Sequence, residues 1–209
     1  MGSSLHLAIS QKCGRLGNKT MARINKEKEW DALLKIKTSG RDDSISNTVN
    51  YPYEPTDYVI LERFANEGYV RKNNTLLDYG CGKGRVGFFM SYQTRCKSIG
   101  IDYDERMIQG AIDNKANAVS GNRIEFICEN AAKYEAEALC FFFYAAKYEV
   151  PVEVDRIYFF NPFSVEILEG VLQRVKDSYY TQPRKCVSFF LHLFTPLHRL
   201  KYWQKLYRM

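Results

Sequence analysis

The chain has 209 residues, of which 45% are hydrophobic and 26% charged, and its net charge is +6 at pH 7. This length and composition are typical of one soluble globular domain with its own core. The longest apolar run, residues 139–146, is far shorter than the ~20 residues of a membrane helix, which argues against a membrane partner. Six cysteines without a C-x-x-C pair argue against a zinc site. With no signal-peptide pattern at the start, the sequence predicts a cytoplasmic protein without a metal.

The basic charge is concentrated at the two ends of the chain. Residues 1–40 contain eight Lys or Arg against three acidic residues, and residues 181–209 contain six against none. Such ends either contact RNA or an acidic protein, or are solvated segments that keep the chain soluble.

Residues 1–50 are predicted to be an N-terminal extension, loose or partly helical, ahead of a domain at 51–209. Within the extension, residues 25–36 fit a short amphipathic helix whose apolar stripe is Trp30, Leu33 and Leu34. The domain opens with "YPYEPTDYVILERF", where Pro55 suits the first turn of a helix. Tyr58, Leu61 and Phe64 would then share one face.

From residue 75 onward, strand patterns alternate with helix patterns. Asp104 is placed to cap the helix that follows the strand expected at 98–102. The inward apolar stripe of this helix is Met107, Ile108, Ala111 and Ile112. Another helix is expected around residues 165–175. The strands are expected at 75–79, 98–102, 124–128, 156–161 and 186–194. This order predicts an α/β fold, a doubly wound, mostly parallel sheet with helices on both faces and a ligand at the carboxyl ends of the strands.

The stretch "LLDYGCGKGRVGFF", residues 76–89, places three glycines in a strand-to-helix turn, where missing side chains permit positive φ and close approach of a ligand. Gly82, Gly84 and Gly87 match the dinucleotide fingerprint, with Asp102 at the expected distance. The charge of Asp78 favours another ligand. A carboxylate there repels an anionic pyrophosphate but attracts a cation.

"DYGCGKG" resembles motif I of class I S-adenosylmethionine (SAM) methyltransferases, D-x-G-x-G-x-G, and SAM carries an ammonium and a sulfonium. The resemblance continues through "SIGIDYDERMI" and "FICENAAKY" and covers residues 51 to about 194. It implies that Asp102 binds the ribose hydroxyls, that Tyr103 covers the adenine, and that Asn130 and Ala131 meet the adenine edge. The implied cofactor-binding set is Asp78, Gly80, Cys81, Gly82, Gly84, Asp102, Tyr103, Asn130, Ala131 and Tyr53. Tyr53 is the preferred candidate for a cap over SAM, and Tyr51 is the second choice. Lys83 and Arg85 would face either the SAM carboxylate or solvent.

"IYFFNPFS", residues 157–164, resembles motif IV of amino-group methyltransferases, Asn/Asp-Pro-Pro-aromatic. The resemblance implies a catalytic set of Asn161, Pro162 and Phe163, in which the Asn161 oxygen accepts a hydrogen bond from the target nitrogen. Phe163 replaces the second proline and Ser164 the aromatic residue, which departs from the pattern that stacks on a planar base.

The sequence therefore indicates a SAM-dependent methyltransferase that moves a methyl group to a nucleophile, with nitrogen favoured and a protein or RNA acceptor favoured over a small molecule. A non-catalytic SAM- or RNA-binding module of the same fold is the alternative, and an NAD-dependent oxidoreductase ranks below both. Family members continue with a helix and a two-stranded hairpin, which the residues after 194 are too few to supply. The sheet is thus expected to be shortened or completed by a partner in an oligomer. In the tail, Leu200, Trp203 and Leu206 suit a helix that covers the sheet edge, in preference to an RNA-binding segment.

Overall fold

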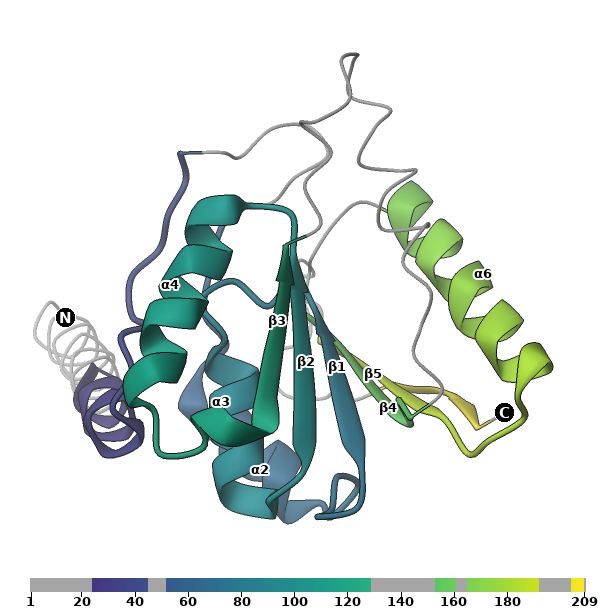
Figure 1. Ribbon diagram of the computed structural model, residues 1–209, viewed down its shortest axis with the longest axis horizontal. Helices are drawn as coiled ribbons and strands as arrows, with labels where there is room; N and C mark the ends of the chain where they lie inside the picture. Colours follow the sequence, from purple (N-terminus) through teal and green to yellow (C-terminus); the bar gives the residue numbers. More distant parts are fainter. Residues whose placement is uncertain (1–23, 45–51, 129–152, 161–164, 192–203, 209) are drawn as a thin grey trace, which may run out of the picture.

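The computed structural model describes residues 24–44, 52–128, 153–160, 165–191 and 204–208, which contain one six-stranded sheet in the order β3-β2-β1-β4-β5-β6 (Figure 1). The first five strands in this series pair in parallel, and β6 pairs antiparallel to β5. The strands are β1 (Thr75–Tyr79), β2 (Lys97–Asp102), β3 (Ile124–Cys128), β4 (Arg156–Phe160), β5 (Val187–Leu191) and β6 (Gln204–Arg208). The doubly wound, mostly parallel sheet predicted from the sequence is confirmed.

Helices lie on both faces of this sheet. Figure 1 shows α2 (Tyr58–Asn66), α3 (Arg85–Thr94) and α4 (Glu105–Asn117) on one side and α6 (Val165–Thr181) on the other. A helix over residues 24–34 and the short 3-10 helix η1 (Gly121–Arg123) complete the described elements. None of the described helices is both long enough and apolar enough to cross a membrane.

The helix starts follow their capping residues. Asp57 accepts the Val59 amide at 2.9 Å and starts α2 at Tyr58, so Pro55 lies before the helix and not in its first turn. Asp104 caps α4, as predicted, by accepting the Arg106 amide at 2.9 Å.

Two predicted stripe positions are wrong. Ile112 is 46% exposed and Leu33 is 51% exposed. Asn114 takes a buried position on α4 because its amide bonds to backbone groups on neighbouring segments. A polar side chain with such hydrogen-bond partners fits a core position as well as an apolar side chain does.

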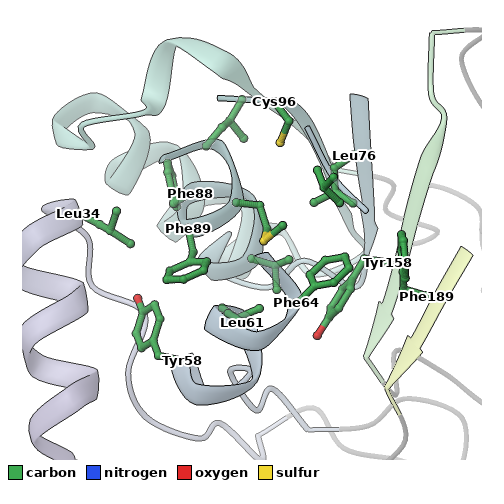
Figure 2. Packing of buried hydrophobic residues seen from close by; sticks show 14 of the residues in the cluster. Leu34, Tyr58, Leu61, Phe64, Leu76, Phe88, Phe89, Cys96, Tyr158 and Phe189 are labelled. Atoms are coloured by element: carbon green, nitrogen blue, oxygen red, sulfur yellow. The ribbon is translucent and has the colours of Figure 1, made fainter. Parts of the chain in front are cut away.

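The core is split by the sheet into two clusters. On the α2 and α3 side, Phe64, Leu76, Phe88 and Tyr158 pack together, as Figure 2 shows. The opposite cluster is built from β1, β2, β4 and α6 and contains Leu77, Tyr79, Ile157, Phe159, Val171 and Val175. Because β1 is buried on both faces, all five of its residues are buried, including Thr75 and Asp78.

The C-terminal tail corrects the helix prediction. Residues Gln204–Arg208 form β6, which pairs with β5 along the sheet edge. Backbone hydrogen bonds to a sixth strand therefore cover the edge of β5.

Arg85, the first residue of α3, is a buried cation that joins three segments. Its side chain is 2% exposed; Nε donates to Thr38 Oγ1 at 2.8 Å, and Nη1 donates to Glu27 Oε1 at 3.2 Å and to the Thr56 carbonyl at 3.1 Å. The guanidinium also lies 4.5 Å from the centre of the Tyr58 ring. These contacts attach residues 24–38 and the segment before α2 to the start of α3.

Asp31 completes this network from the helix at residues 24–34. Its carboxylate accepts the Thr38 amide at 2.9 Å and the Thr38 hydroxyl at 2.8 Å, and it also accepts the hydroxyl of Tyr58. Arg85 Nη2 lies 3.9 Å from Asp31 Oδ1. The predicted alternatives for Arg85, the SAM carboxylate or solvent, are both wrong because this acidic network surrounds its side chain.

Replacing Arg85 by Met should lower the free energy of unfolding by about 3 kcal/mol, because the carboxylates of Glu27 and Asp31 lose their buried cation. Urea denaturation of the purified chain measures this. Arg123→Met, at an exposed arginine, is the matched control and should stay within about 0.5 kcal/mol of wild type. Equal stability of the two variants would contradict the role of Arg85.

Candidate functional site

The glycine turn connects β1 to α3 at the carboxyl edge of the sheet. Gly80, Gly82 and Gly84 have φ values of 74°, 52° and 83°, a region that residues with a Cβ rarely adopt. The amides of Gly80 and Cys81 both donate to the Ile101 carbonyl, at 2.8 and 3.0 Å. The turn is therefore fixed to the end of the neighbouring strand β2.

The protein itself fills the space beside two of these glycines. A Cβ on Gly82 would overlap the ring of Tyr53, and a Cβ on Gly84 would lie 2.5 Å from Cζ of Phe126. Gly80 is exposed. The missing side chains at Gly82 and Gly84 thus make room for aromatic rings, whereas the sequence prediction attributed this close approach to the ligand. Gly80 presents bare backbone to the surface.

Asp102, the last residue of β2, holds the turn in place. Its Oδ2 accepts the Gly82 amide at 2.7 Å, and its Oδ1 accepts the Asp104 amide at 3.0 Å. Burial raises the pKa of this carboxyl to about 6, against the opposite effect of the backbone amides. One carboxylate therefore shapes both the glycine turn and the start of α4.

Asp78 lies on β1, immediately before the turn, in a different environment. It is 3% exposed, and its Oδ2 has no hydrogen-bond partner among the described residues. Burial, together with the nearby charge of Asp102, raises the pKa of Asp78 to about 8. A buried acceptor of this kind is complementary to a cationic ligand group, so the chemistry of SAM fits this position.

Tyr53 covers the turn from the segment before α2. Its hydroxyl donates to the Thr38 carbonyl at 2.7 Å, and its backbone forms an antiparallel bridge with Asp42, with hydrogen bonds of 3.0 and 2.9 Å. Lys83 Nζ lies 5.1 Å from the centre of its ring. Residues 36–44 and 52–57 thereby form a strap, held across Gly82 by Tyr53.

The remaining predicted residues divide into two groups. Tyr103 is half-buried beside Asp102, and burial together with that charge raises the pKa of its hydroxyl to about 12. Cys81 is buried, which raises the pKa of its thiol and leaves it protonated at neutral pH. The second group lies outside the described residues: Tyr51, Asn130, Ala131, Asn161, Pro162 and Phe163.

Sequence reasoning missed three contributors to this region. Thr38 orients Tyr53, Phe126 packs against the turn, and Tyr158 pairs with Asp78 across β1 and β4. The hydroxyls of Tyr158 and Thr56 lie 3.3 Å apart, in a buried polar pair. Alternation along β4 places Tyr158 on the face of Asp78, but no local pattern marks Thr38, because its role depends on a contact between distant segments.

The segment that contains the glycine turn is similar to a known protein family. Residues 70–143 match a family model described as a methyltransferase domain. The search of curated proteins found no match to this sequence.

Solved structures share the fold at low identity. A Pyrococcus horikoshii protein, provisionally described as an RNA methyltransferase, is 14% identical, with a TM-score of 0.50 over 79% of this chain and 72% of that one. YjhP from E. coli is 15% identical, with a TM-score of 0.50 over 66% of this chain and 49% of that one, so the match spans about half of the longer protein. An RNA methyltransferase from Salinibacter ruber, crystallised with S-adenosyl-L-homocysteine, is 18% identical, with a TM-score of 0.47 over 71% of this chain and 87% of that one.

The sheet order, the glycine turn and the matched segment define a Rossmann-like methyltransferase fold. Within this fold, residues 70–143 are similar to a methyltransferase domain. The matches leave the subfamily unspecified.

Without SAM, the raised pKa of Asp78 should make folding sensitive to pH. The pKa is 3.8 for an ordinary aspartate and about 8 in the fold, so the folded state binds the proton more tightly. The stability that this proton provides is complete below pH ~4, is lost with a slope of up to about 1.4 kcal/mol per pH unit, and levels off above pH ~8. Asp78→Asn, which stays neutral, should lack this component in denaturation curves measured across that range. Parallel pH profiles for the two proteins would show that the Asp78 carboxyl is not buried as described.

Proposed function

We propose that the chain transfers the methyl group of SAM to a nitrogen nucleophile on a macromolecular acceptor. The observation that carries the proposal is the orphaned, buried Oδ2 of Asp78 next to exposed Gly80 at the carboxyl edge of β1. The ammonium group of SAM complements that pair of features better than an anionic pyrophosphate does.

In this proposal the cofactor is held along the turn. Asp78 binds the ammonium group, and the backbone of Gly80 and Cys81 contacts the cofactor. Asp102 accepts hydrogen bonds from the ribose hydroxyls through its remaining lone pairs. Tyr103, Asn130 and Ala131 contact the adenine, and Tyr53, seated on Gly82 beside Gly84, closes the turn. When bound, SAM supplies an electrophilic methyl group on its sulfonium.

The acceptor is assigned to the residues that follow β4. That strand lies beside β1 in parallel, with Phe159 opposite Tyr79, so its carboxyl end reaches the same edge as the glycine turn. Asn161 follows β4 in the chain, and its side-chain oxygen would accept a hydrogen bond from the acceptor N–H, with Pro162 and Phe163 shaping the approach. Holding a nucleophile in line provides a large part of the rate enhancement, without a strong base.

Asp102→Ala should weaken SAM binding by on the order of 1.5–3 kcal/mol, the usual size for hydrogen bonds to a charged group. Isothermal titration calorimetry measures the loss, and a thermal melt verifies that the variant is folded. Asp102→Asn keeps one acceptor oxygen and should lose less, and Glu105→Ala, at an exposed acid nearby, should bind as wild type does. Binding of NAD by the wild-type protein without any response to SAM would overturn the proposed cofactor.

Asn161→Ala should lower turnover while SAM affinity stays within about threefold of wild type, because the lost contact is made with the acceptor. Transfer of labelled methyl groups to fractionated protein and RNA measures turnover, and calorimetry measures SAM. An equal loss of SAM binding would make Asn161 a cofactor residue. SAM binding by the wild type without methyl transfer to any fraction would favour a non-catalytic binding module.

A further inference from the structure

A cavity of about 330 Å³ lies between α4, residues 35–37 and Lys83 of the glycine turn. Three lysines line it, Lys35, Lys37 and Lys83, together with Asp113 and Asn117 from α4. The lysines outnumber the single lining carboxylate, and Asp113 Oδ1 is already engaged by Gln109 Nε2 at 2.9 Å. The cavity therefore carries excess positive charge.

Asn114 holds two of these lysines in place through their backbones. Its Oδ1 accepts the Lys37 amide at 2.8 Å, and its Nδ2 donates to the carbonyls of Lys37 and Lys83 at 3.3 and 3.1 Å. Asn114 is buried, so these hydrogen bonds are protected from water. The lysines thus extend from backbone that is fixed, although they belong to segments far apart in sequence.

Lys35 occupies a backbone conformation that normally favours glycine. Its φ is 59°, in the left-handed region, just after the helix over residues 24–34. This is the conformation of a helix C-cap, because the Lys35 amide donates to the Ala32 carbonyl at 3.2 Å and the Ile36 amide donates to the Asp31 carbonyl at 2.9 Å. The cap fixes the backbone from which the Lys35 side chain extends.

The side chains that line the cavity favour one kind of anionic ligand over others. The lining residues are lysine, asparagine, aspartate and glycine, without an aromatic or aliphatic wall. Such a surface offers no pocket for the side chains of a peptide and no face for a base to stack upon. Lysine ammonium groups are compact point charges that bind phosphates without the planar geometry of arginine.

We infer that this lysine cavity binds a backbone phosphate of a single-stranded RNA acceptor. The inference rests on the proposed function and deepens it by naming single-stranded RNA as the macromolecular acceptor. Because Lys83 belongs to both the cavity and the glycine turn, a strand held here would lie beside that turn. Its phosphate would position the strand without reading its sequence.

The test uses the full chain and a labelled single-stranded RNA oligonucleotide, with binding followed by fluorescence anisotropy from about 50 to 200 mM salt. The double variant Lys35→Gly/Lys37→Gln should reduce the slope of log K against log salt by about 0.7, the contribution of one neutralised phosphate of a single strand. Its melting temperature should be unchanged or higher, because glycine relieves the backbone at position 35. The same variant should bind SAM as wild type does.

The matched control is Lys72→Gln/Lys97→Gln, which removes the same charge from two exposed lysines at the amino ends of β1 and β2 and should keep the wild-type slope. Equal slopes for the cavity variant and wild type would overturn the inference, as would displacement of RNA by an equal phosphate concentration of inorganic pyrophosphate. Salt-dependent binding of a polyglutamate peptide in place of RNA would also overturn it. Loss of RNA binding alone leaves SAM binding, and hence the proposed methyl transfer, intact, so the two proposals fail separately.

Discussion

The organisation of the site depends on one buried cation. Arg85 is desolvated at the start of α3, where it needs acceptors that its own helix does not supply. Those acceptors come from Glu27, Thr38 and the backbone before α2, which draws residues 24–38 onto the methyltransferase core. Thr38 in turn fixes Tyr53 over the glycine turn. The region that the sequence presents as an extension is therefore packed, through this contact, against the glycine turn.

The two aspartates beside the turn show how environment assigns different roles to one side chain. Asp102 receives two backbone amides, and its pKa is about 6, whereas Asp78 receives no such bond among the described residues, and its pKa is about 8. The first carboxylate is satisfied by the protein and maintains its shape. The second keeps a cost of burial, which a cationic ligand would offset.

Local patterns were sufficient for the sheet and the turn, and insufficient for the contacts between segments. Parallel strands such as β1 are buried on both faces and are therefore rich in apolar residues. The positive φ values at positions 80, 82 and 84 favour glycine. The burial of Arg85 and Asn114 could not be predicted, because their partners lie 31 to 77 residues away for Asn114 and 29 to 58 for Arg85. The tail was assigned to a helix because Leu200, Trp203 and Leu206 recur at helical spacing, yet pairing with β5 decides its conformation.

The sheet order has a consequence for how the chain is made. β1 is the third strand across the sheet, and its two neighbours are β2, which begins at residue 97, and β4, which begins at residue 156. During vectorial synthesis, α2 through β3 emerge and pair while one long side of β1 still has free backbone groups. Until residues 156–160 leave the ribosome, one side of β1 therefore keeps unpaired backbone groups, the kind of edge at which chains associate. The strand that carries Asp78 is thus completed only late in synthesis.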